Sequence, residues 1–117
     1  MWISHAEAEY EKRARGWPKK HIREFVAVHD NLETLLLALN QGARIGHFKL
    51  GFMHPEPRGV IAIDQKGGGA GLKETRLYTY PMIPTQVIHL ITLGDKSTQK
   101  ADIEYASKFV DELIRQK

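Results

Sequence analysis

The residues best suited to chemistry in this chain of 117 residues surround a glycine-rich stretch. The glycines lie between positions 67 and 71, and Lys66, Lys73, Arg76 and Tyr78 flank them. Because glycine permits positive φ and the close approach of another backbone, the stretch predicts a loop. The flanking cations suit phosphate, yet exposed lysine and arginine are also the ordinary state of a protein surface. The stretch is therefore either a polyanion site or a solvated loop.

Several catalytic classes do not fit the sequence. A nucleotide P-loop requires Ser or Thr after its lysine, whereas Glu74 follows Lys73. The dinucleotide fingerprint requires a helix after the glycines, and strand-like sequence follows here. The histidines lack the spacing of a helical metal motif, although His47 and His54 could meet across a sheet, and the chain has no cysteine and no serine nucleophile elbow. We expect no metal and no cofactor.

Metal-free cleavage of a phosphodiester is compatible with the residues present. An RNA 2′-hydroxyl can attack its own adjacent phosphate, so the protein has to remove one proton, stabilise the anionic phosphorus and protonate the leaving oxygen. Lysine, arginine, histidine and tyrosine side chains suffice for these steps. Clustered cations would lower the pKa of a lysine toward that of a working base, and an arginine would hold the phosphate by a two-pronged contact.

The charge of the chain favours acidic or nucleic-acid partners. The net charge is +3, the sequence pI is about 9.2, and the segment from Lys12 to Arg23 is rich in basic residues. That segment either contacts phosphate, pairs with an acidic partner segment, or forms a solvated helix face. No apolar run reaches the roughly 20 residues of a membrane span, and the first residues lack a signal-peptide core. We expect one soluble, cytoplasmic domain over residues 1–117.

Helices are predicted at both ends of the chain. Ser4 and Glu7 form a capping-box pattern that predicts a helix from His5 to Arg15. The residues from Gly16 to Pro18 break this helix, and a second helix follows from Lys19 to Gln41, so that the two pack as a hairpin. An apolar stripe predicts a terminal helix that is capped by Ser97 or Thr98.

The middle of the chain has the short apolar segments of strands. We predict four antiparallel strands at residues 44–52, 59–64, 72–80 and 86–93. The expected fold is α+β, with N-terminal helices and a C-terminal helix packed on an antiparallel sheet of about four strands. The expected core consists of Phe25, Leu35, Leu36, Leu39, Ile61, Ile63, Ile88, Leu90, Ile91, Phe109 and Leu113.

Two segments resemble a known family. The run GLKETRLY, from Gly71 to Tyr78, resembles the G-L-[RK]-x-x-R strand of RelE/HigB-type toxins. The run VIHLITLGDKSTQKADIEYASKFVDEL, from Val87 to Leu113, is similar to their closing strand, turn and helix. The resemblance implies a RelE-like fold and the toxin of a type II toxin–antitoxin system. Its activity would be metal-independent endoribonucleolytic cleavage of mRNA on the ribosome, silenced by a cognate antitoxin in a hetero-oligomer.

The resemblance also assigns residues. Lys73 and Arg76 match the basic positions of the family strand, and Lys96 matches the basic residue after the last strand, so these three are the candidate catalytic residues. Lys66, Tyr78 and His89 are further candidates for RNA binding or proton transfer. The bland alternative is that Lys73 is only solvated and that Arg76 pairs with a neighbouring carboxylate, Glu74 or Asp64.

Three features differ from the family pattern. The chain opens on helix-like sequence where the family opens on a strand, and the segment from Gly46 to Gln65 is longer than usual. Strict alternation would also place Lys73 and Arg76 on opposite faces of a strand, unless a bulge intervenes or Lys73 lies in the loop. Two other functions remain open: a non-catalytic RNA-binding or regulatory module, and a ParE-like gyrase inhibitor.

Overall fold

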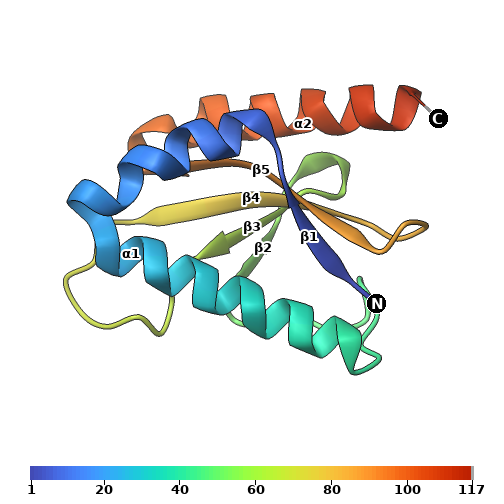
Figure 1. The fold of residues 1–117 in the computed structure, drawn as a ribbon, viewed down its shortest axis with the longest axis horizontal. Coiled ribbons are helices and arrows are strands. Elements are labelled where there is room, and N and C mark those ends of the chain that lie inside the picture. The colour runs from blue at the N-terminus through green and yellow to red at the C-terminus, as the bar shows by residue number, and fades with distance from the viewer. Residues whose placement is uncertain (117) are drawn as a thin grey trace.

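The computed structural model describes residues 1–116, which form an α+β fold with two α-helices on a mixed five-stranded sheet (Figure 1). The helices are α1 (Ala8–Asn40) and α2 (Gln99–Arg115), with short 3₁₀ turns η1 (Pro57–Gly59) and η2 (Lys96–Thr98). The strands are β1 (Ile3–Ala6), β2 (Met53–Pro55), β3 (Ile61–Asp64), β4 (Thr75–Met82) and β5 (Val87–Asp95). The strand order is β1-β5-β4-β3-β2, with β1 parallel to β5 and the other pairs antiparallel.

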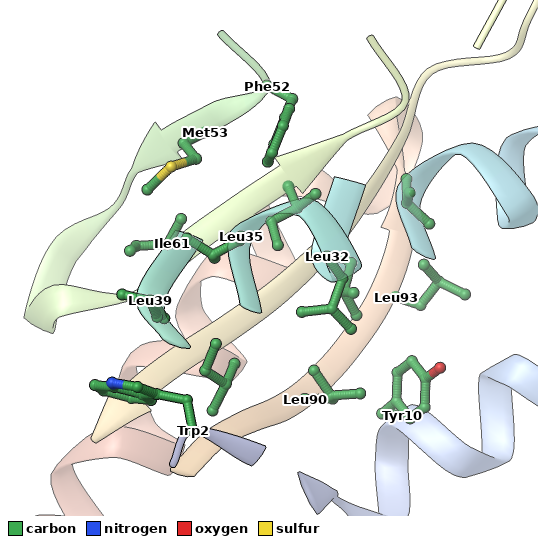
Figure 2. Close-up of a cluster of buried hydrophobic side chains, with 14 residues drawn as sticks. Trp2, Tyr10, Leu32, Leu35, Leu39, Phe52, Met53, Ile61, Leu90 and Leu93 are labelled. Carbon is green, nitrogen blue, oxygen red and sulfur yellow. The ribbon is translucent and has the colours of Figure 1, made fainter. Parts of the chain in front are cut away.

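The two helices cover opposite faces of the sheet. Successive side chains along a strand point to opposite faces, so neighbouring residues of one strand pack against different helices. On β4, Leu77 packs in the larger cluster with Leu35 of α1, whereas Tyr78 packs in the smaller cluster with Val110 of α2. Figure 2 shows the larger cluster, in which Leu35 and other leucines of α1 point toward the strands. A register shift between Tyr78 and Thr79 places Ile91 of β5 in the smaller cluster.

Most of the predicted core is buried. The buried members are Leu35, Leu39, Ile61, Ile63, Ile88, Leu90 and Ile91. Phe25, Leu36 and Phe109 are partly buried and pack against the two clusters. Leu113 is also only partly buried, and it lines an open hollow at the surface.

The prediction of a helix from His5 is wrong. Residues Ile3–Ala6 form β1, and α1 begins at Ala8 with Glu7 at its N-cap position but without a side-chain cap bond. Main-chain bonds from Ile3 to Gln86 (3.1 Å) and from Glu7 to Leu90 (3.0 Å) tie this segment to β5. Pairing with a distant strand therefore overrides the local capping pattern, and the sheet gains a fifth, parallel strand.

The predicted helical hairpin is present inside α1. The Tyr10 hydroxyl lies 2.5 Å from His29 Nε2, although a straight helix would separate residues 19 positions apart by about 28 Å. The reversal occurs at His21 (φ −134, ψ 49), a few residues after the predicted break. Pro18 contributes because it has no N–H for the carbonyl one turn earlier.

The strand predicted at residues 44–52 is wrong, because that segment consists of turns and irregular backbone. Gly46 adopts a φ of +87, which ends any extended run, and only the short β2 (Met53–Pro55) follows. The other three predicted strands are present as β3, β4 and β5, with β4 and β5 displaced toward the C-terminus by up to three residues. The later start of β4 leaves Lys73 in the loop.

Candidate functional site

The candidate catalytic residues gather around the end of β5. Arg76 of β4 lies opposite Gly94 in the strand register, and Thr75 lies opposite Asp95. Lys73 precedes β4 by two residues, and Lys96 follows β5 directly. The sheet therefore brings Lys73, Arg76 and Lys96 to one end.

Lys73 is held by two carboxylates through different atoms. Its Nζ lies 3.2 Å from Asp95 Oδ2, and its backbone N–H donates to Glu24 Oε2 at 2.8 Å. A hydrogen bond from Ser97 and the nearby Lys73 lower the pKa of Asp95, while the Lys73 N–H lowers the pKa of Glu24. The Lys73 side chain remains 53% exposed, so its ion pair with Asp95 is open to solvent.

The Arg76 side chain is less exposed than that of Lys73, and two carboxylates lie beside it. Its Nη1 lies 3.7 Å from Glu56 Oε2, and its Nε lies 3.4 Å from Glu74 Oε1, without the geometry of a hydrogen bond among residues 1–116. Asp64, the other expected partner, instead contacts His54 Nε2 at 2.6 Å. Arg76 therefore has to exchange a carboxylate for a phosphate if it is to bind one.

Lys96 is an exposed cation that projects from a capped turn. Asp95 caps η2 by accepting a hydrogen bond from the Ser97 N–H at 2.9 Å, and the Thr98 hydroxyl accepts from the Asp95 N–H at 3.2 Å. This reciprocal cap fixes the backbone on both sides of Lys96, while its side chain extends into solvent.

A buried ion pair sets the position of the β5 end. Asp102 of α2 is 1% exposed and accepts a hydrogen bond from Arg13 Nη1 at 2.8 Å, while the same nitrogen donates to the Leu93 carbonyl at 2.9 Å. Gly94 leaves the space for this carboxylate, since a Cβ there would lie 1.9 Å from Asp102 Oδ2. Arg13, one of the basic residues of the predicted cluster, is therefore a structural residue.

The glycine loop, residues 65–74, is docked on the second half of α1. The Asn31 side chain donates to the carbonyls of Asp64 (2.8 Å) and Lys66 (3.1 Å), and Arg23 Nη2 donates to the carbonyl of Ala70 (3.0 Å). A Cβ on Gly68 would lie 2.5 Å from the Ala27 side chain, so the loop packs directly against the helix. Sequence analysis did not identify Glu24, Ala27 or Asn31 as supports of this loop, and no local pattern marks them.

Exposed cations from three separate segments lie at this end of the molecule. Figure 1 shows that the α1 bend, the glycine loop, the end of β5 and the start of α2 all meet there. The exposed basic residues of these segments are Lys19, Lys20, Arg23, Lys66, Lys73, Lys96 and Lys100. We call this set the cationic end. Lys66, predicted as an RNA-binding residue, belongs to it.

Tyr78 and His89 do not belong to the cationic end. Tyr78 is fully buried, and burial raises the pKa of its phenol well above the usual range, so the side chain does not reach a ligand at the surface. His89 faces Tyr80 in the register, and its Nδ1 donates a hydrogen bond to Glu7 Oε2 at 2.8 Å. It lies five residues along β5 from Gly94, about 17 Å away.

Five hollows on the described surface are lined by residues other than Lys73, Arg76 and Lys96. His89 lines one of about 340 Å³ together with His5 and Glu7. The exposed cations of the cationic end come from several segments, an arrangement that suits an extended ligand.

No group of three or more metal-ligating side chains occurs within residues 1–116. His54 bonds to Asp64 rather than meeting His47, which is exposed in the segment before β2. Neither α1 nor α2 carries an apolar stretch of the length and low charge that a bilayer span requires, over the part of the chain described.

Comparison of the chain with protein-family models, with curated proteins and with solved structures gives no match in any of the three. The chemistry of the cationic end is therefore the basis on which a function can be assigned.

Proposed function

We propose that this protein is a RelE/HigB-type toxin that cleaves mRNA on the ribosome without a metal ion. The observation that carries the proposal is the gathering of Lys73, Arg76 and Lys96 around the end of β5, within a wider set of exposed cations. Two further observations support it. The chain opens on a strand, β1, as the family does, and Lys73 lies in the loop, which removes the conflict of strand alternation.

In the proposed reaction, the RNA 2′-hydroxyl attacks the adjacent phosphorus and loses its proton to a base. The bond to the 5′ oxygen breaks, that oxygen gains a proton, and a 2′,3′-cyclic phosphate and a 5′-hydroxyl result. Negative charge on the phosphorane is greater than in the ground state, so the fixed cations Lys73 and Lys96 stabilise the transition state preferentially. Arg76 joins them by exchanging Glu56 or Glu74 for a phosphate oxygen.

The carboxylates around these cations occupy the positions that RNA phosphates would take. Asp95 lies beside Lys73, and Glu56 and Glu74 lie beside Arg76, before RNA arrives. A polyanion competes with these carboxylates, because its successive phosphates present several linked charges to the cationic end at once. An acidic segment of a cognate antitoxin would compete in the same way, and a hetero-oligomer that covers the cationic end would silence the toxin.

The test is cleavage of ribosome-bound mRNA by Lys73→Ala, Arg76→Ala and Lys96→Ala variants. Loss of one transition-state contact should slow cleavage by roughly a hundredfold or more, by analogy with the removal of single oxyanion donors. Lys108→Ala, an exposed lysine in the second half of α2, is the matched control and should cut at the wild-type rate. Wild-type rates in all three site variants, with the fold intact, would sink the assignment.

The two alternative functions predict different results for the same purified protein. A non-catalytic RNA-binding module would bind RNA in a salt-dependent manner and leave it intact. A ParE-like protein would inhibit supercoiling by gyrase and leave RNA intact as well.

A further inference from the structure

The two edges of the sheet differ in how their main-chain groups are satisfied. At the β2 edge, the Met53 N–H donates to the Leu50 carbonyl at 2.9 Å, and Pro55 has no N–H to offer. Neither Met53 nor Pro55 therefore has an N–H left to donate to an added strand. A sheet edge that is blocked by a turn and a proline resists the addition of another strand.

The β1 edge is open over a short length. Ile3 and Glu7 donate their N–H groups to β5, so the alternation of a strand points the N–H groups of Ser4 and Ala6 outward. Within residues 1–116, no hydrogen bond from either of these two N–H groups is found. Trp2 is different, because the Asn40 side chain accepts its N–H at 2.6 Å and donates to its carbonyl at 3.2 Å.

A hollow of about 500 Å³ is lined by Trp2, which immediately precedes this open edge in the chain. Its apolar lining includes Trp2, Leu39, Ile45 and Ile83, and its basic lining consists of Arg44 and His47. Ile83, in the turn between β4 and β5, is 59% exposed, and Ile3 on β1 is 57% exposed. Figure 1 shows the start of β1, the end of α1 and the β4–β5 turn close together, at the opposite end of the molecule from the cationic end.

We propose that this edge and hollow bind an extended segment of a partner protein that combines apolar and acidic residues. The segment adds to β1 as a sixth strand and pairs with the outward groups of Ser4 and Ala6. One of its apolar side chains enters the hollow between Trp2 and Ile83, and a carboxylate next to it meets Arg44.

The charge of the hollow selects this occupant over a second copy of the chain. A symmetric pair that met at this surface would bring Arg44 and His47 of one copy toward the same residues of the other. An acidic partner segment relieves that repulsion, whereas a purely apolar segment would leave Arg44 without a counter-charge. The inference goes beyond the proposed function and does not depend on RNA cleavage, since the edge lies away from Lys73 and Lys96.

The probe is a blocked, fluorescent ten-residue peptide that alternates isoleucine with glutamate, and its control carries lysine in place of glutamate. We expect the glutamate peptide to bind in fluorescence anisotropy and to slow the hydrogen exchange of the Ser4 and Ala6 amides. Ser4→Pro removes an outward N–H without removing a bond to β5, and Arg44→Glu reverses the charge at the hollow. Each should weaken binding by roughly tenfold, the effect of losing one hydrogen bond or charge pair.

Lys49→Glu is the matched control, because Lys49 lies in the same segment as Arg44 but lines a different hollow. It should bind the peptide as the wild type does. The proposal is overturned if the lysine peptide binds equally well, or if neither peptide binds the folded wild type. It is also overturned if sedimentation shows a dimer of the free protein that Ser4→Pro dissociates, since a second copy would then be the occupant.

Discussion

The two faces of the sheet are built from different chemistry. The face toward α1 is apolar, with leucines of the helix packed on Leu77, Leu90 and Leu93. The face toward α2 contains the Asp102 carboxylate bonded to Arg13, and the buried hydroxyls of Tyr78 and Thr92 have no partner within residues 1–116. The first face supplies hydrophobic stability, whereas the second also fixes the end of β5 from which Lys96 projects. Substitutions on the two faces should therefore separate stability from activity.

The largest loss of stability is expected on the apolar face. Leu35→Ala empties a fully buried position and should lower the free energy of unfolding by about 3 kcal/mol, in the range of core leucine truncations. Chemical denaturation followed by circular dichroism measures the loss. RNA cleavage per folded molecule should stay near the wild-type value, because Leu35 belongs to the apolar core and not to the cationic end. Leu36→Ala, at a partly buried neighbour, is the control and should cost less.

Asp102→Ala should lower both stability and activity. The change removes the partner of Arg13 from a buried position, and because the arginine is about a third exposed, the cost should be about 2 kcal/mol, below the range for fully buried pairs. Freed from α2, the end of β5 should also position Lys96 less well, so cleavage per folded molecule should fall. Asp102→Asn retains hydrogen-bonding groups, so its stability and its cleavage rate should lie between those of the wild type and those of Asp102→Ala. An alanine variant that is destabilised but cuts normally would show that the ion pair does not position the site.

The smallest effect concerns the cap beside Lys96 and depends on pH. Because the pKa of Asp95 is lowered in the folded state, its contribution to stability is present above its unfolded value of about 3.9 and is lost as pH falls through the folded value. Ser97→Ala removes the leading cause of that shift, so the pKa of Asp95 should rise, as carbon-detected NMR titration would show. The variant should be less stable than the wild type at neutral pH by less than about 1 kcal/mol. The difference should vanish in acid, and a difference that persists there would contradict this role of the cap.

The sequence was sufficient for the elements with strong local patterns. Short apolar segments marked β3, β4 and β5, and the apolar stripe marked α2. It failed for β1, because Ser4 and Glu7 imitate a helix cap, while the strand exists only through its pairing with β5. The irregular segment 44–52 was misread as a strand because its apolar residues pack without extended backbone.

The candidate site was predictable to a similar degree. β4 and β5 are consecutive along the chain and pair antiparallel, so the start of β4 lies beside the end of β5. This pairing brings Lys73, Arg76 and Lys96 to the same end of the sheet. Tyr78 was not interpreted correctly, since both faces of the sheet are covered and alternation alone does not show that α2 buries its side chain. The support of the glycine loop by Glu24 and Asn31 depends on the bend of α1, which brings distant residues together.

The central claim is that the cationic end binds RNA phosphates, and the salt dependence of binding tests it most directly. A single-stranded RNA oligonucleotide should bind the wild type with an affinity that falls as salt rises, with a logarithmic slope of about 0.7 for each phosphate contact. Lys73→Ala and Lys96→Ala should each reduce that slope by roughly 0.7, and Lys108→Ala should leave it unchanged. Equal slopes for all four proteins would contradict the claim.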